Sequence, residues 1–227
     1  MAKILCLETA TTNCSVSIGV NGEVKSLVEE NSPNYSHSEQ LHVFVERAVA
    51  RASMTLSDLD AIAVSKGPGS YTGLRIGVSY AKGLCYALDI PLISIDSLKG
   101  IANGALQEVP SDAIIAPMID ARRMEVYSEV YDASGTSIRE TKAEVITESS
   151  FADYTSCKRV HLIGPGASKC QEVLTYPVFS YNTTAIPSAQ ELASLAERKF
   201  KQQEFEDVAY FEPYYLKDFV LQGKKKP

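Results

Sequence analysis

The order of strand and helix patterns in this sequence predicts an α/β fold in which one unit occurs twice. Strand-like runs lead to a strand that ends at the turn Gly67-Pro68-Gly69, and a long helical run follows the turn. Further strand-like runs lead to a similar turn, Gly164-Pro165-Gly166, with another helical segment behind it. The shared order predicts an internal duplication with a degenerate second copy, which lacks the first copy's amphipathic helix. We expect two subdomains, residues 1–108 and 109–227, with the C-terminal segment packing back on the first.

Composition and charge limit the classes of function. The chain has 227 residues, 45% of them hydrophobic, which suffices for a buried core. It contains no run of about 18 apolar residues, so we expect neither a membrane span nor a signal peptide. The five cysteines never form a CxxC pair and are predicted to be free thiols in a reducing cytoplasm. The net charge is −6 with one basic run, Lys224–Lys226, which argues against direct RNA or DNA binding by this chain alone.

The first unit begins with a predicted three-stranded antiparallel meander. Residues 3–8 are apolar and rich in β-formers, and residues 14–20 alternate between apolar and polar side chains. Asn21-Gly22 is a strong signal for a two-residue hairpin turn, so residues 23–29 are expected to pair back.

Two helices of different character follow. The first has its apolar residues at helical spacing behind a capping-box pattern, Ser36–Glu39, and is predicted to be amphipathic. The second, residues 71–88, is apolar on nearly all sides and contains Gly77 and Gly83, which each cost up to about 1 kcal/mol relative to alanine. Close packing would compensate for these glycines. We therefore expect one face of the helix on the sheet and the other against a partner helix, from this chain or from a second subunit.

The rest of the chain carries shorter patterns. Strands are predicted at residues 60–64, 91–95, 113–119, 125–131, 138–146 and 160–163, and short helices at 98–106 and 167–174. A second capping box, Ser188–Glu191, is expected to open a final helix.

The segment around the first glycine turn is the candidate for ligand binding. A strand, a glycine turn and a helix N-terminus together can hold a phosphate group. The spacing fits neither GxxxxGK[ST] nor GxGxxG, so a tight turn without a ligand is the alternative. The residues expected to contact a phosphate or nucleotide at a subunit boundary are Lys66, Gly67, Gly69, Ser70, Thr72 and Arg75. Lys66 and Arg75 are alternatively plain solvated side chains.

Four charged residues surround the start of a predicted strand: Asp120, Arg122, Arg123 and Glu125. They form either a salt-bridged strand edge or a surface that faces the inter-subdomain cleft or a partner. In the second case the arginines are able to bind phosphate with two hydrogen bonds each.

Four stretches, taken in order, carry a resemblance to a known family. They are ILCLETAT at 4–11 with CSVS at 14–17, GPGSYTGLRIGVSYAKGL at 67–84, IDARRMEVY at 119–127 and EPYYL at 212–216. In this order and spacing they resemble the TsaB (YeaZ) family along almost the whole chain. The resemblance implies an actin-like ATPase fold, the ASKHA class of Hsp70 and the sugar kinases, with two duplicated subdomains.

The same resemblance implies a function in tRNA modification. TsaB proteins take part in the synthesis of N6-threonylcarbamoyladenosine as non-catalytic partners of a TsaD-type transferase, together with a TsaE-type ATPase. TsaD-like sequences carry an HxxxH metal pair where this chain has Ser97 and Ile101, and neither side chain replaces an imidazole. Residues 8–12 also lack the glycine of a kinase-type phosphate hairpin. We expect an accessory subunit without catalytic residues, metal or resident cofactor. Binding of ATP or ADP at the partner interface stays an open alternative.

The resemblance also implies where partners bind. It assigns the contact with the transferase, and a competing homodimer of the free chain, to the two N-terminal helices. An apolar stripe with glycine suits helix-on-helix packing. The expected interface residues are Val43, Arg47 and Ala50 on the first helix and Ile76, Tyr80, Gly83 and Ala87 on the second. tRNA would be met only through the assembled complex.

Two other functions are kept as alternatives: an active actin-fold ATPase or phosphotransferase, and a regulatory homodimer that works alone. An active enzyme needs an intact phosphate hairpin with acidic metal ligands, against which Thr9-Ala10-Thr11 argues. A peptidase is not supported, because the chain has no HExxH motif. His37 and His42 are five residues apart on one helix and cannot face one metal, and His161 lies in the other half.

Overall fold

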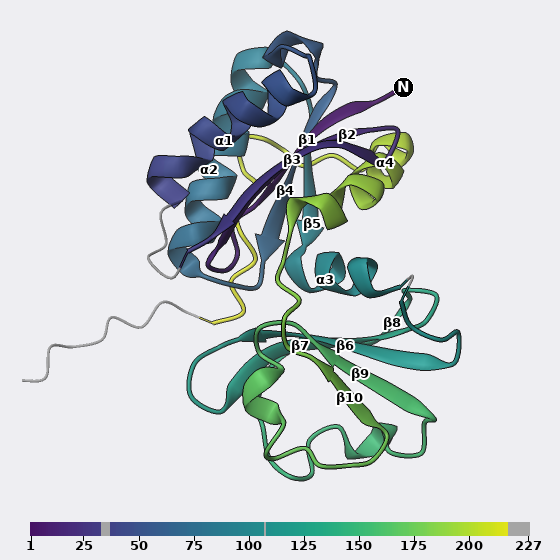
Figure 1. Cartoon of the computed structure of the whole chain (residues 1–227). Coiled ribbons are helices and arrows are strands. Elements are labelled where there is room, and N and C mark those ends of the chain that lie inside the picture. The colour runs from purple at the N-terminus through teal and green to yellow at the C-terminus, as the bar shows by residue number, and fades with distance from the viewer. Residues whose placement is uncertain (33–36, 107, 218–227) are drawn as a thin grey trace, which may run out of the picture.

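Two β-sheets lie one above the other, each with helices or short turns packed on it (Figure 1). The computed structural model describes residues 1–32, 37–106 and 108–217. The predicted capping residue Ser36 and the basic run Lys224–Lys226 therefore lie outside the described residues. We call residues 1–105 the first half and residues 113–182 the second half.

The first half is built on a five-stranded mixed sheet. Its strands are β1 (Lys3–Glu8), β2 (Asn13–Val20), β3 (Glu23–Asn31), β4 (Ala61–Gly67) and β5 (Leu92–Asp96), in the order β3-β2-β1-β4-β5. β1, β2 and β3 pair antiparallel, which confirms the predicted meander, while β4 and β5 continue the sheet in parallel. Asn21 and Gly22 both have positive φ, 54° and 82°, as a two-residue hairpin turn requires.

Helices cover both faces of this first sheet. The predicted helices α1 (His37–Arg51) and α2 (Tyr71–Leu88) lie side by side on one face, over a core that includes Leu5, Leu7 and Phe44. The opposite face packs against a short 3-10 turn, η4 (Ala189–Leu192), and the helix α4 (Ala193–Gln202), which come from the C-terminal part of the chain. α3 (Ser97–Ala105) follows β5 and lies between the two sheets.

The second half repeats the topology of the first. Its strands are β6 (Ala113–Asp120), β7 (Glu125–Asp132), β8 (Ser137–Val145), β9 (Arg159–Ile163) and β10 (Phe179–Asn182), in the order β10-β9-β6-β7-β8. As in the first half, the first three strands pair antiparallel and the last two in parallel. The matching glycines, Gly67 and Gly164, have φ values of 115° and 111°. The order of strands and the two turns confirm the predicted duplication.

One prediction for the second half was wrong. Residues 167–174 do not form a helix; a single 3-10 turn, η3 (Ser168–Cys170), stands there instead. The segment buries Cys170 and Leu174. Only a few residues then remain before β10, a strand that the sequence analysis did not predict. The final helix expected after Ser188 is present as α4; Ser188 accepts a hydrogen bond from the backbone of Gln190 at 3.4 Å and caps the 3-10 turn η4, which leads into this helix.

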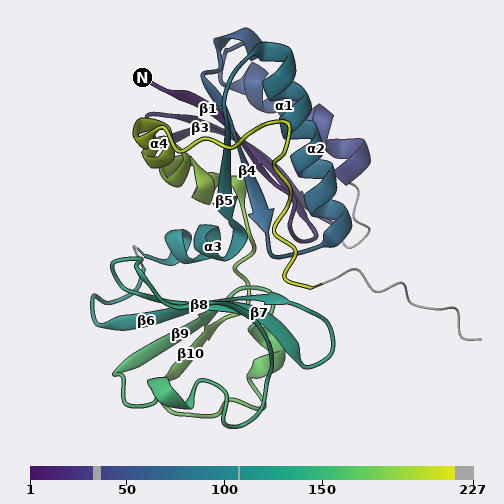
Figure 2. The ribbon, with the colours of Figure 1, turned by 180° about the vertical axis from the view of Figure 1, so that it is seen from behind.

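A C-terminal strap, residues 203–217, returns along the first half (Figure 2). It bridges the edge of β5 through Glu206 and then passes α2, where the Lys82 ammonium donates to the carbonyls of Ala209 and Phe211 at 3.1 and 2.9 Å. All five cysteines are free. No described helix is long and apolar enough to span a bilayer.

Candidate functional site

The turn between β4 and α2 packs directly against the turn that follows β1. Ser70 caps α2 by accepting from the Gly73 amide at 3.3 Å, and its own amide donates to the carbonyl of Ala10 at 2.7 Å. A Cβ atom on Gly69 would lie 2.4 Å from that carbonyl oxygen, and one on Gly73 would lie 2.1 Å from the carbonyl oxygen of Thr9. Only glycine permits this approach, so the close contact explains the glycines of the turn.

A buried carboxyl group lies beneath this turn. Glu8, the last residue of β1, is 1% exposed, and its Oε1 accepts from the Ala10 amide at 2.6 Å and from the Ser65 hydroxyl at 2.8 Å. Burial raises the pKa of Glu8 to about 7, although these hydrogen bonds favour the charged form. The chain's own carboxyl group thus satisfies an amide of the turn after β1.

The structure separates the residues predicted to bind a phosphate or nucleotide. Gly67, Gly69 and Ser70 belong to the packed turn, whereas Thr72 is exposed on α2. Lys66 forms an ion pair with Asp96 at 3.3 Å, on the side that faces the second half. Arg75 instead contacts the C-terminal strap and donates to the Tyr215 hydroxyl at 3.0 Å, with its guanidinium 4.2 Å from the ring centre of Tyr71. Both cations therefore have partners within the chain, and the phosphate contact stays a prediction.

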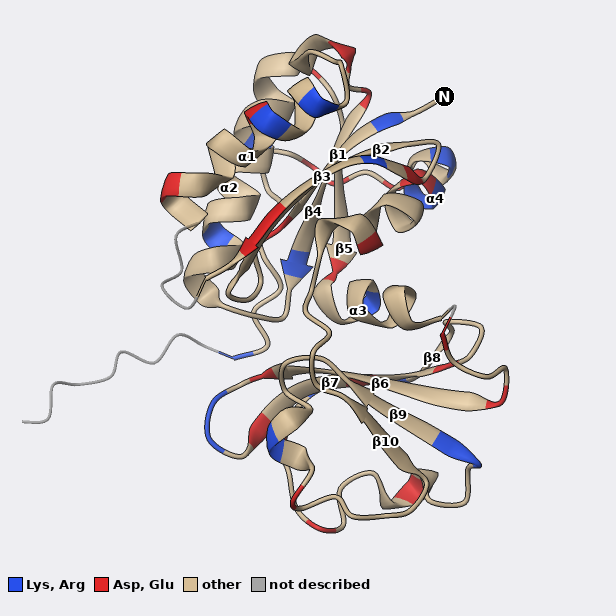
Figure 3. Ribbon diagram, in the orientation of Figure 1, with Lys and Arg blue, Asp and Glu red and all other residues tan. Residues whose placement is uncertain are grey.

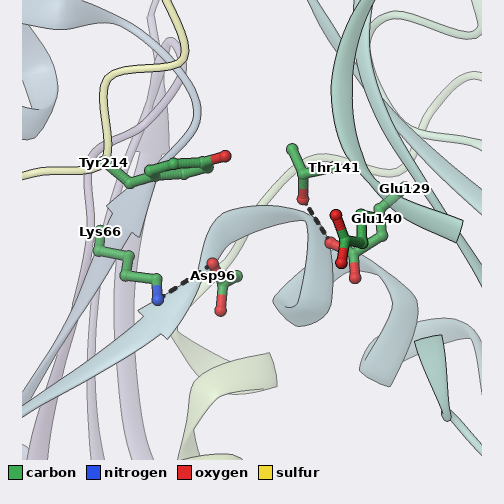
Figure 4. A pocket seen from close by; sticks show the side chains of 6 residues that line it. All are labelled: Lys66, Asp96, Glu129, Glu140, Thr141 and Tyr214. Atoms are coloured by element: carbon green, nitrogen blue, oxygen red, sulfur yellow. Dashed lines mark hydrogen bonds and ion pairs between the residues drawn. The ribbon is translucent and has the colours of Figure 1, made fainter.

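Lys66 lines a cavity between the two halves (Figure 4). The cavity has a volume of about 280 Å³ and is lined by Lys66, Asp96, Glu129, Glu140, Thr141 and Tyr214. Glu129 is nearly buried and accepts hydrogen bonds from the hydroxyls of Ser137 and Thr141 at 2.7 and 2.6 Å. Three carboxylates thus stand against one ammonium group, and this excess of negative charge disfavours a polyphosphate. Sequence reasoning missed this cavity because its residues come from distant segments; Lys66 and Tyr214 lay in stretches that stood out, but nothing in the sequence joined them to the carboxylates.

The seven predicted interface residues all lie on α1 and α2. Arg47, Ala50, Gly83 and Ala87 are exposed, whereas Val43, Ile76 and Tyr80 are half-buried with part of each side chain on the core. Burial, and to a smaller extent the Glu46 carboxylate of α1, raise the pKa of Tyr80 on α2. A Cβ atom built on Gly83 has no neighbour within 4 Å, and Tyr86 on the next turn is 86% exposed.

The four charged residues near the start of β7 divide into two paired and two unpaired groups. Asp120 binds Lys169 and Glu125 binds Lys217, whereas Arg122 and Arg123 are exposed and take part in no described ion pair. Figure 3 shows a loop coloured blue, for Lys or Arg, at the edge of the second half beside β6 and β7.

The positions where the resemblance expects metal-binding histidines are part of the core. Ser97 begins α3 and is fully buried, and Ile101 packs in a cluster with Leu98 and Ile115. Within the described ranges, no three His, Cys, Asp or Glu side chains gather as a metal site.

The sequence matches a family model and known proteins along most of its length. A sequence model of the family described as "TsaD: tRNA N6-adenosine threonylcarbamoyltransferase" matches residues 32–225. The tRNA threonylcarbamoyladenosine biosynthesis protein TsaB of Haemophilus influenzae is 28% identical over 235 residues, which cover 99% of this chain and 97% of that protein.

Solved structures share the fold along nearly the whole chain. YeaZ from Pseudomonas aeruginosa is similar with a TM-score of 0.81 and 28% identity, over 95% of this chain and all of that chain. The activator of 2-hydroxyisocaproyl-CoA dehydratase from Clostridium difficile, solved with bound ADPNP, has a TM-score of 0.53 at 12% identity, over 90% of this chain and 98% of its own. The second likeness concerns the fold alone. With the two matching sheets, these similarities assign the structure to the actin-like ATPase fold predicted from the sequence.

Proposed function

Because this chain belongs to the TsaB (YeaZ) family of tRNA threonylcarbamoyladenosine biosynthesis proteins, we propose that it is a non-catalytic subunit that docks on a TsaD-type transferase. Docking uses the outer face of α1 and α2 and activates the transferase together with a TsaE-type ATPase, in the cytoplasm. The free chain forms a homodimer through the same face, so dimerisation and docking compete.

The observation that carries the proposal is the open position at Gly83. This glycine sits on the exposed side of a helix, where a side chain would meet nothing and where glycine lowers helix stability by up to about 1 kcal/mol. The free chain therefore gains nothing from glycine here, whereas a helix of another molecule can approach the backbone closely. Half-buried apolar groups of Ile76 and Tyr80 lie on the same helix, two turns and one turn earlier, and Val43 adds a third from α1.

Three features favour an accessory role over an ATPase. Ile101 is part of the hydrophobic core at the position where a metal ligand would be needed. The cavity between the halves carries more carboxylates than cations, and the carboxyl group of Glu8 binds an amide of the turn that would hold a phosphate in a kinase of this fold. The first feature opposes a metal ion at that position, and the other two oppose the phosphate groups of a nucleotide.

A substitution at Gly83 tests the proposed surface. Gly83→Arg adds a long charged side chain where the free chain has room for it, so the fold is expected to stay intact. The matched control is Gln202→Arg, an exposed position of α4 on the opposite face of the first sheet. Light scattering on chromatographed samples measures the mass of each chain alone and mixed with the TsaD-type transferase.

We expect the wild type and the Gln202→Arg control to form the heteromeric complex and the Gly83→Arg variant to remain free. If the Gly83→Arg variant assembles as well as the control, the subunit role stands and the docking face is wrong. If the wild type forms no complex with the transferase, the proposed function itself is wrong. Steady ATP turnover by the purified chain alone would favour the ATPase alternative.

A further inference from the structure

The turn between β6 and β7 presents two arginines in an unfavourable backbone conformation. We call residues 121–124 the arginine turn. Arg122 and Arg123 have φ values of 71° and 49°, in the left-handed region that glycine and asparagine tolerate best. Both side chains are exposed. A turn chosen for stability alone would carry Asn or Gly at these positions, so the arginines point to a use outside the fold.

The backbone of the arginine turn is held from beneath by one lysine. The ammonium group of Lys169, whose side chain is 17% exposed, donates to the Asp120 carboxylate at 2.7 Å, to the Arg123 carbonyl at 2.7 Å and to the Glu125 carbonyl at 2.6 Å. The Asp120 carboxylate also accepts from the Arg122 amide at 2.6 Å. The turn is therefore fixed before any ligand arrives.

The same contacts leave both guanidinium groups without an acidic partner. Lys169 neutralises Asp120, and Lys217 at the end of the strap neutralises Glu125. Among the described residues, no ion pair or hydrogen bond involves the side chain of Arg122 or Arg123. Two adjacent guanidinium groups on a fixed backbone, with no partner among the described residues, suit phosphate oxygens, which each guanidinium binds with two parallel hydrogen bonds.

The arginine turn lies beside the end of α2 that begins the proposed docking face. Lys217 joins Glu125, next to the turn, to the strap, and Tyr215 of the strap stacks on Tyr71 of α2 with ring centres 4.8 Å apart. Figure 3 shows the blue loop on the same side of the molecule as α2. The strap therefore connects the region beside the turn to the first residue of α2.

We propose that the arginine turn binds the phosphodiester backbone of the substrate RNA when this chain is docked on the transferase. The proposal rests on the proposed function. The net charge of −6 means that the two arginines alone attract RNA weakly, so they contribute as part of a composite surface rather than as a separate binding site.

The test replaces the two arginines with residues that favour the left-handed backbone conformation of the turn. Arg122→Asn combined with Arg123→Gly keeps the left-handed conformation and is expected to leave the melting temperature unchanged or higher. The control, Lys158→Asn combined with Arg159→Gln, makes the same change in net charge at two exposed residues where β9 begins. Arg159 pairs with Ala113, at the far end of β6 from the arginine turn.

Unmodified tRNA is titrated into complexes of the transferase, the ATPase and each variant at several salt concentrations, after light scattering has established assembly. We expect the arginine-turn variant to bind about tenfold more weakly at 0.1 M salt. The slope of log affinity against log salt should fall by about 1.4 to 1.8, since each lost phosphate contact contributes about 0.7 to 0.9. The control should match the wild type.

Equal affinity of the assembled wild-type and arginine-turn complexes would overturn this proposal while the docking role stands. An equal loss in the control would overturn it too, because the effect would then be one of overall charge. Failure of the arginine-turn variant to assemble would assign the turn to a protein contact instead. Failure of the wild type to assemble would remove the proposed function, and this proposal with it.

Discussion

The first half covers one face of its sheet with two full helices, α1 and α2, whereas the second half covers the matching face with short 3-10 turns. In the first half α1 stands between β3 and β4 and α2 between β4 and β5. The corresponding connections of the second half hold only η2 (Ala152–Tyr154) and η3. Both faces are closed hydrophobic clusters, so short turns are enough to bury the core beside a sheet of this topology.

Comparing the two halves distinguishes the features that both halves share from those that only the first half has. Both halves keep a glycine turn that approaches the backbone at or just after the first strand, since a Cβ atom on Gly69 would lie 2.4 Å from the Ala10 carbonyl oxygen and one on Gly164 would lie 2.6 Å from the Met118 carbonyl oxygen. The turn is therefore a requirement of the duplicated fold and is no sign of a ligand by itself. The long helices are present in one half alone, and with them an outer face for which the fold has no need.

The largest expected change in the free energy of unfolding comes from adding one methyl group where α2 meets the turn after β1. Gly73→Ala would bring a Cβ atom to 2.1 Å from a backbone oxygen, and we expect a loss of about 3 kcal/mol in the free energy of unfolding. Gly83→Ala makes the same change two to three turns later in open space and should gain up to about 1 kcal/mol. Urea unfolding of both variants measures the difference. Similar values for the two would mean that α2 is not held against the turn after β1.

The sequence predicted the strong elements of the first half because local patterns determine them. α2 matched its predicted range, and Asn21-Gly22 defined the hairpin. Prediction failed in the second half where tertiary contacts outweigh local preference: the predicted helix at 167–174 is a turn that places Cys170 and Leu174 in the core. The cavity between the halves was not predictable, because contacts such as that of Lys66 with Asp96 depend on how β4 and β5 align.

The second effect concerns the buried acid of the first half, Glu8, which has no buried counterpart at the end of β6, where Asp120 is exposed. Folding keeps the proton on Glu8 up to about pH 7, whereas the unfolded chain releases it near its ordinary pKa of 4.5. Between these values the folded state binds more protons, so the stability that the neutral carboxyl provides is complete below pH 4.5 and is lost as the pH rises to 7. The expected loss is on the order of 2 to 3 kcal/mol.

Glu8→Gln should remove this part of the pH dependence, because the amide oxygen still accepts from Ala10 and Ser65. Urea unfolding between pH 4.5 and 7.5 gives the difference between the wild type and the variant at each pH. Gln171→Ala, at an exposed residue of the second half without a titratable side chain, serves as the control and should leave the slope unchanged. Parallel curves for the wild type and the Glu8→Gln variant would mean that Glu8 is charged in the folded protein throughout this range.

The smallest expected effect is on the local opening of the strap, which contacts both halves and is held mainly by the first. Tyr215→Ala removes the stacking on Tyr71 and the hydrogen bond from Arg75, worth about 1 kcal/mol together. Local opening of the strap should therefore become about fivefold more frequent, and limited proteolysis after residue 203 correspondingly faster, with little change in global unfolding. Tyr176→Ala, which breaks an aromatic pair with Phe179 in the second half, should leave this cleavage rate unchanged. If Tyr215→Ala also leaves it unchanged, backbone contacts such as that of Tyr214 with Lys66 hold the strap, and α2 is free of it at its first turn.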